Sequence, residues 1–184
     1  MTRAMFVAAL LAALQGKGNP DFKYDERAGV SMQKFPKNDE WDFKEMGKFL
    51  KAPKLVVAHK VDELTIEVAQ SPPQPNTTGY DLKKQIEVDY AGIGGDKNLM
   101  DVKQVEMKPS KLPNGGGGGA NAMFLHVTFK FQDAPMELRE WAFVGKENQS
   151  LYVVFVSSGE GIYKKHQKII EFILGNLKTY KIPK

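Results

Sequence analysis

Cysteine is absent from the 184 residues of this chain. Its absence excludes disulfide bonds, zinc sites built from thiolates and a thiol nucleophile. It does not separate an oxidising from a reducing compartment, because a chain without cysteine suits both. Histidine is scarce too: His59, His126 and His166 are the only imidazoles in the sequence for metal binding or acid–base chemistry.

Neither sign of charge dominates. The 26 basic residues are mixed with 22 acidic ones, so the net charge of +4 is spread thinly over the chain. We therefore expect no nucleic-acid partner. With 42% hydrophobic residues, a chain of 184 residues is long enough for one domain with a sizeable core and too short for two.

The N-terminus has the pattern of an export signal. Arg3 precedes an apolar run at residues 4–14, and a small-x-small triplet follows at residues 16–18. The run is too short to span a bilayer. We predict a signal peptide at residues 1–18 and a single domain at residues 19–184, which is periplasmic or secreted if the signal is cleaved. The alternative is a short helix that docks on the body of a cytoplasmic protein.

The most apolar part of the body is residues 150–177, where the periodicity changes halfway along. Residues 151–156 are strand-forming, whereas beyond Gly161 apolar residues recur at helical spacing. Ser157 and Glu160 have the spacing of a capping box at the helix start. We predict a strand followed by a C-terminal helix that packs on the sheet.

Further patterns of alternation extend this sheet. Strands are predicted at residues 29–35, 55–59, 64–69, 101–108, 124–131 and 136–144. A second helix is predicted at residues 80–93, with Thr78 and Asp81 as its cap and Asp89 interrupting its apolar stripe. Short connections force antiparallel neighbours. We therefore predict an α+β fold, an α/β/α sandwich in which an antiparallel sheet of about six to seven strands lies between helices.

Two segments between these elements carry less information. Residues 37–54 mix aromatic side chains with lysines and acids, which fits an irregular loop or one amphipathic helix. Both alternatives stay open. Three prolines within residues 71–79 indicate an exposed loop.

Five consecutive glycines, Gly115 to Gly119, call for a comparison with phosphate-binding loops. Such a loop needs Lys and Ser or Thr directly after the glycines, whereas Ala120, Asn121 and Ala122 follow. A dinucleotide site needs a helix there, but the next pattern is that of a strand. We predict a flexible linker between strands, with no nucleotide and no other cofactor.

The histidines form no recognisable site in the sequence. A predicted turn separates His59 from Asp62, so no helix face directs both at one ion, and we expect no metal site. His166 lies on the apolar stripe of the last helix, where a half-buried, hydrogen-bonded ring is expected. His126 lies on the strand face opposite its apolar neighbours, and is the candidate for a cleft residue. No residue is assigned a catalytic role.

A basic block beside two aromatic residues is the candidate contact surface. Trp41 and Phe43 could anchor an acidic protein partner or an anionic membrane surface, although core positions are the favoured alternative. The lysines of this candidate surface are Lys44, Lys48 and Lys51.

Three features together resemble the PsbP-like proteins, relatives of an extrinsic subunit of photosystem II and of a nuclear-import factor that binds the GTPase Ran. They are the strand at residues 29–35 leading into Pro36 and Trp41, the helix at residues 80–93, and the closing segment that ends Ile173-Leu174-Gly175-Asn176-Leu177-Lys178. The resemblance covers residues 25–181. In the family the proline and tryptophan are closer together, and the glycine run is not part of the pattern.

Two hypotheses on function follow. The resemblance implies an exported, non-enzymatic accessory protein that binds another protein. The alternative is a small-molecule binder or an enzyme that uses a cleft between the sheet and its helices, with His126 as its polar group.

Overall fold

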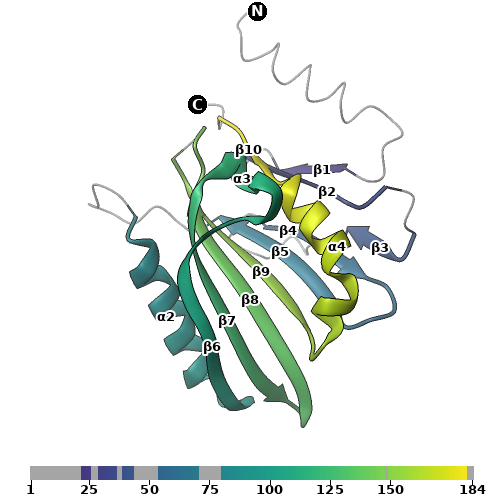
Figure 1. The fold of residues 1–184 in the computed structure, drawn as a ribbon, viewed down its shortest axis with the longest axis vertical. Coiled ribbons are helices and arrows are strands. Elements are labelled where there is room, and N and C mark those ends of the chain that lie inside the picture. The colour runs from purple at the N-terminus through teal and green to yellow at the C-terminus, as the bar shows by residue number, and fades with distance from the viewer. Residues whose placement is uncertain are drawn as a thin grey trace, which may run out of the picture.

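The computed structural model describes residues 22–25, 29–36, 39–43, 54–70, 80–147 and 149–181, shown in Figure 1. Its main element is a seven-stranded antiparallel sheet in the order β3-β4-β5-β9-β8-β7-β6. The strands are β3 (Trp41–Phe43), β4 (Lys54–His59), β5 (Leu64–Gln70), β6 (Leu99–Lys111), β7 (Asn121–Phe131), β8 (Ala134–Val144) and β9 (Leu151–Gly159). The predicted β4–β5 hairpin and β7-β8-β9 meander are confirmed.

Helices cover both faces of this sheet, as predicted. The helix α2 (Leu82–Gly95) packs on β6, β7 and β8, and α4 (Ile162–Gly175) lies on the other face, against β5 and β9 (Figure 1). The two faces have separate apolar clusters because strand side chains alternate. Ile86 of α2 packs with Leu125, Val127 and Ala142. The α4 side holds the larger cluster, which includes Trp41 and Phe143.

A second, three-stranded sheet was not expected as a separate unit. It consists of β1 (Phe22–Asp25), β2 (Val30–Gln33) and β10 (Lys178–Thr179), in the order β1-β2-β10. Val30 and Met32 of β2 are fully buried, and so is Ser31, which the alternation places on the other face of the strand. The short β10 follows α4, so its pairing with β2 joins segments from the two ends of the chain.

The helix starts differ from the predicted caps. Asp81 caps α2, since its Oδ1 accepts the Lys84 N–H at 3.0 Å, whereas Thr78 lies outside the described residues. The predicted Ser157–Glu160 box is wrong. β9 runs on through Ser157, which is paired with Leu138 and Thr65, and α4 begins after Gly161 in a left-handed conformation. Pairing on both sides keeps Ser157 in the strand.

The glycine run is not a flexible linker, and that prediction is wrong. After the single turn η1 (Pro113–Gly115), the short α3 (Gly116–Gly119) turns against the end of α4. A Cβ on Gly116 would lie 1.9 Å from the Leu174 carbonyl oxygen, and one on Gly117 2.7 Å from the Phe143 ring. The glycines therefore permit this turn to pack closely against α4 and β8.

Part of the segment left open between loop and helix is now assigned. Trp41–Phe43 is the edge strand β3, paired with β4, which neither alternative foresaw. Residues 44–53 lie outside the described residues, as do the predicted signal peptide at 1–18 and the proline loop at 71–79.

Candidate functional site

One end of the main sheet brings together three connections. They are the β4–β5 loop at residues 60–63, the β7–β8 turn and the junction between β9 and α4. Antiparallel pairing brings the ends of these strands to the same end of the sheet. This end contains a cleft and a cluster of two histidines with an aspartate.

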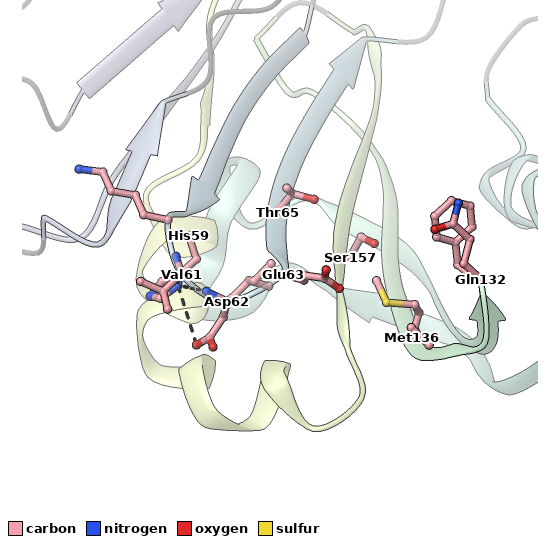
Figure 2. Close-up of a pocket in the computed structure, with 12 residues that line it drawn as sticks. His59, Val61, Asp62, Glu63, Thr65, Gln132, Met136 and Ser157 are labelled. Atoms are coloured by element: carbon pink, nitrogen blue, oxygen red, sulfur yellow. Dashed lines mark hydrogen bonds and ion pairs between the residues drawn. The ribbon is translucent and has the colours of Figure 1, made fainter.

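The cleft has a volume of about 540 Å³. Its lining is formed by His59, Lys60, Val61, Asp62, Glu63, Leu64, Thr65, Phe131, Gln132, Ala134, Met136 and Ser157. Figure 2 shows Val61 and Gln132 at opposite sides of the opening, with Glu63 and Ser157 between them. Val61 is 78% exposed and Phe131 is 43% exposed. Apolar side chains therefore border the cleft from the β4–β5 loop and from the end of β7.

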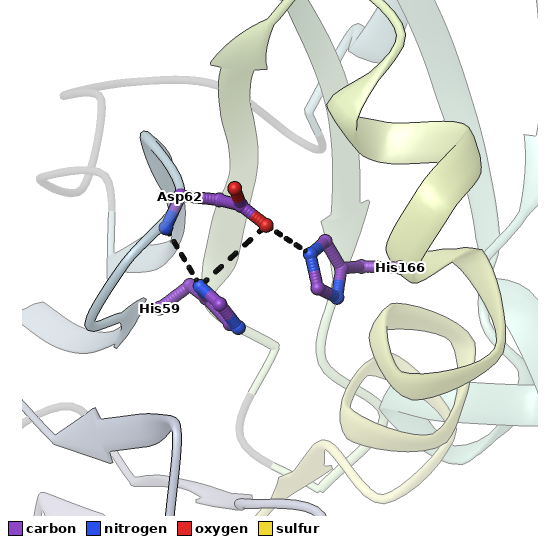
Figure 3. Close-up of side chains that lie close together, drawn as sticks. All are labelled: His59, Asp62 and His166. Atoms are coloured by element: carbon purple, nitrogen blue, oxygen red, sulfur yellow. Dashed lines mark hydrogen bonds and ion pairs between the residues drawn. The ribbon is translucent and has the colours of Figure 1, made fainter.

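Asp62 is the centre of the neighbouring cluster (Figure 3). Its Oδ2 lies 2.5 Å from His166 Nε2 and accepts a hydrogen bond from Lys165 Nζ at 2.8 Å. These two hydrogen bonds, that of Lys165 first, lower the pKa of Asp62 to about 2. The carboxylate therefore stays ionised and ties the β4–β5 loop to α4.

His59 is held by the same loop. Its Nδ1 accepts the Asp62 N–H at 2.9 Å and the Val61 N–H at 3.3 Å. Since an acceptor nitrogen carries no proton, the proton of the neutral ring is on Nε2. That atom is buried and lies 3.4 Å from Glu40 Oε2, without the alignment of a hydrogen bond.

Trp41 joins the two histidines to the core. Its ring meets His59 and His166 edge-to-face, with centroids 5.2 and 5.7 Å apart, while the two imidazoles lie 4.4 Å apart. Trp41 is 0% exposed, and its indole Nε1 has no partner within the described part of the chain. It is therefore a core residue, the alternative that the sequence favoured over a contact anchor.

The other members of the predicted contact surface are only partly described. Phe43 is half-buried and packs against the core. Lys44, Lys48 and Lys51 lie outside the described residues. The surface as a whole stays a prediction.

His126 belongs to a polar network beneath α4. Its Nε2 lies 3.2 Å from Glu137 Oε2, an atom that Arg139 Nη1 contacts at 2.6 Å, and the Arg139 guanidinium stacks 3.7 Å above the Tyr163 ring. Burial, and then the charge of Arg139, lower the pKa of His126, so the ring is neutral. His126 does not line any of the three cavities that the described residues form at residues 59–65, 115–118 and 101–103 with their neighbours.

Glu140 occupies the opposite face, under α2. It is 0% exposed, and neither carboxyl oxygen has a hydrogen-bond donor in the described structure. Burial, and then a hydrogen bond and charge from Asp89 of α2, raise the pKa of Glu140 to about 9. Glu140 is therefore a neutral acid at neutral pH that faces Asp89, whose Oδ2 accepts a hydrogen bond from Gln85 at 2.8 Å.

The sequence did not predict that His59, Asp62 and His166 lie together, and it did not single out Glu140. The turn was expected to separate His59 from Asp62, whereas it folds the Asp62 N–H back onto the ring. The inward position of His166 was visible in the helical stripe, but its partner lies 104 positions away. The burial of Glu140 could have been inferred from the alternation of β8, which places it on the same strand face as Leu138 and Ala142.

The layers, the antiparallel order and the closing helix are those of the PsbP-like fold. The solution structure of cyanobacterial PsbP (CyanoP) from Synechocystis sp. PCC 6803 aligns with a TM-score of 0.54 over 90% of this chain and 96% of that one, at 12% identity. The resemblance found in the sequence is thus confirmed for the fold. No family model and no curated protein matches the sequence.

Two crystal structures share this fold. LpqN of Mycobacterium tuberculosis, described as involved in cell envelope biogenesis, aligns with a TM-score of 0.53 and 12% identity over 98% of both chains. A protein from Bacteroides thetaiotaomicron VPI-5482 aligns with a TM-score of 0.57 and 12% identity over 89% of this chain. The present chain spans 50% of that protein's length. Within the described residues, no helix is long and apolar enough to cross a membrane.

Proposed function

We propose that this chain is a non-enzymatic accessory protein that acts outside the cytoplasm and binds another protein in the cleft at the end of its sheet. The occupant is an extended segment of the partner with an apolar anchor side chain. The observation that carries this proposal is the pair of exposed apolar residues, Val61 and Phe131, on opposite borders of the cleft.

The chemistry of the cleft favours binding over catalysis. An exposed apolar rim beside a recess suits an anchor residue, which gains most when water is excluded around it. The polar groups at hand are engaged in internal contacts: Asp62 with Lys165 and His166, and His59 Nδ1 with two backbone N–H groups. Ser157, one of the hydroxyls that line the cleft, lies in a β-strand with no histidine bonded to it in the described structure.

The proposed location rests on the N-terminal pattern, which has the charge, apolar run and small-x-small triplet of a secretory signal. LpqN, with the same fold, is described as involved in cell envelope biogenesis, which is compatible with this location. N-terminal sequencing of the native protein tests it. A mature start near residue 19 supports export, whereas an intact Met1 contradicts it.

Binding is tested by placing a photo-crosslinking amino acid at position 61 or 131 in the native host. Both positions should yield the same adduct with one partner protein. Position 88 is the matched control, since Val88 is also apolar and 58% exposed but lies on α2. The Val61→Asp variant should lose the adduct formed from position 131.

Equal adduct formation from position 88 would show that the contact is unspecific. Absence of any adduct from positions 61 and 131, with the protein present at its native level, would contradict the proposal as well. Circular dichroism of Val61→Asp provides the folding control, and the exposure of Val61 predicts an unchanged spectrum.

A further inference from the structure

We propose that His59, Asp62 and His166 form a binding site for a divalent transition-metal ion, with Zn²⁺ as the probe. This inference rests on other observations than the proposed partner binding, although His59 and Asp62 also line the cleft. One ligand atom from each residue lies within 4.8 Å of the other two. Two imidazole nitrogens and a carboxylate oxygen are a donor set that zinc accepts, and a fourth position would be open to water.

The distances around Asp62 allow an ion to enter with small side-chain movements. Zinc bonds of about 2.0–2.2 Å place the ligand atoms of a tetrahedral site about 3.4 Å apart. The separation from Asp62 Oδ2 is 2.5 Å to His166 Nε2 and 3.8 Å to His59 Nδ1. Relative to Asp62 Oδ2, one ring has to retreat and the other to approach, each by less than about 1 Å, and the two ring nitrogens, which lie within 4.8 Å of one another, have to draw closer by up to about 1.4 Å.

A cation already occupies the outer side of this carboxylate. Lys165 Nζ contacts Asp62 Oδ2 at 2.8 Å, but the lysine side chain is 61% exposed and can leave for water. The ammonium therefore acts as a weak internal competitor for the carboxylate. Its removal should therefore strengthen metal binding. This outcome distinguishes a metal site from a cluster that only links the β4–β5 loop to α4 and needs Lys165 for that link.

His59 already has the tautomer that ligation requires. Its Nδ1 carries a lone pair, which two backbone N–H groups share, and its Nε2–H is buried 3.4 Å from Glu40 Oε2. Histidines that bind zinc through one nitrogen commonly direct the other N–H at a carboxylate. Ligation through Nδ1 would replace the two backbone N–H contacts, and the ring rotation towards Asp62 would have to align Nε2–H with Glu40 Oε2 to gain this support.

The cleft provides access to the site. His59 and Asp62 both line the cavity of about 540 Å³, and the Asp62 side chain is 16% exposed. An ion can enter from this side without displacing the core, since the Trp41 ring packs against the histidines from within. The fourth coordination position would face the cleft.

The test is calorimetric titration of the full chain, without an affinity tag, with Zn²⁺ alone at pH 7.5. We expect one ion per chain. Asp62→Asn and His166→Gln should each weaken binding by at least about 100-fold, and Lys165→Gln should strengthen it several-fold. His126→Gln is the matched control and should bind zinc as the unmodified chain does, because His126 belongs to another network.

A second measurement does not depend on any variant folding. Nitrogen chemical shifts of the histidines in the unmodified chain should change on zinc addition for His59 and His166, and stay constant for His126. Binding that survives His166→Gln, shifts confined to His126, or no binding by either the unmodified chain or Lys165→Gln would each overturn the proposal.

Discussion

Two acidic side chains on opposite sides of the same sheet are tuned in opposite directions. Asp62, on the α4 side, has its pKa lowered to about 2, whereas Glu140, under α2, has its pKa raised to about 9. Lys165 and His166 donate to Asp62. Glu140 is fully buried, and the group that faces it is another carboxyl, Asp89.

The comparison shows that the neighbours decide what a carboxyl does in this fold. Contact with a cation keeps Asp62 charged, so it can link the β4–β5 loop to α4. Burial beside a like charge makes Glu140 a neutral acid, so it adds no second negative charge to the contact between α2 and the sheet. The charged site borders the cleft, while the neutral one is enclosed.

The largest effect is expected from Gly116→Ala, which disturbs the α4 side alone. The new Cβ would meet the Leu174 carbonyl oxygen at 1.9 Å, and backbone cannot yield as a side-chain tip can, so we expect a loss of more than about 3 kcal/mol in unfolding free energy. Denaturant unfolding measures it. Gly119→Ala is the control: it meets no atom within 4 Å and should cost about 1 kcal/mol for its left-handed conformation.

The two faces should respond independently to that change. In Gly116→Ala the titration of Glu140, followed by the carbon chemical shift of its carboxyl, is expected to stay near its unmodified position, because Glu140 lies on the α2 side. A large shift of this titration would show that the faces are coupled through the sheet.

Glu140→Gln is expected to stabilise the protein by about 3 kcal/mol at neutral pH. Folded Glu140 keeps its proton up to about pH 9, whereas the unfolded side chain releases it near 4.5. The folded state therefore binds more protons between these values, and stability falls as the pH rises through them. Glutamine removes this loss, because its side chain stays neutral in both states.

The measurement for this variant is a series of denaturant unfolding curves from pH 5 to 9. The gain should grow with pH and be smallest near pH 5. Glu87→Gln, at an exposed acid of α2, the helix that covers Glu140, should show no such trend. A gain of equal size at every pH would contradict the raised pKa.

Asp89→Asn should produce a smaller gain, about 1 kcal/mol at neutral pH. It removes the charge that faces Glu140, but burial, the larger cause of the raised pKa, remains. The pKa of Glu140 should therefore fall and still exceed 4.5. Carboxyl titration by NMR measures it, and an unchanged pKa would show that Asp89 does not act on Glu140.

The smallest effect is expected at Asp62, because its lysine partner is largely in solvent, where ion pairs contribute little. Its folded pKa of about 2 lies below the unfolded value of 3.8. The stability that it adds is therefore present above pH 3.8 and is lost as the pH falls towards 2. In chelator-treated protein, Asp62→Asn should flatten the stability profile within this window and leave it parallel to that of the unmodified chain above pH 5. An unflattened profile would contradict the pairing.

Local pattern predicted much of the fold. The alternation of Leu64, Ile66 and Val68 predicted β5, and all three are buried on the α4 side. Short connections predicted the antiparallel meander. The glycine run shows the limit: its residues have no side chains to form a pattern, and the atoms that crowd Gly116 and Gly117 belong to Leu174 and Phe143.

The candidate site was less accessible to sequence reasoning. His126 was selected because it lies opposite apolar neighbours, and the structure places it beside Glu137. His59, Asp62 and His166 were each assigned to a separate local setting. Nothing in a local pattern states that the turn after β4 and the first turns of α4 reach the same end of the sheet.

The sequence by itself determined the periodicities, and with them the longer strands, the two long helices and the α+β class, because these depend on neighbours within a few residues. The order of strands around β9, the second sheet closed by β10 and the pKa values of Asp62 and Glu140 were decided only in the tertiary structure. Those properties depend on charges, burial and contacts between residues far apart in the chain, which exist only once the layers have packed.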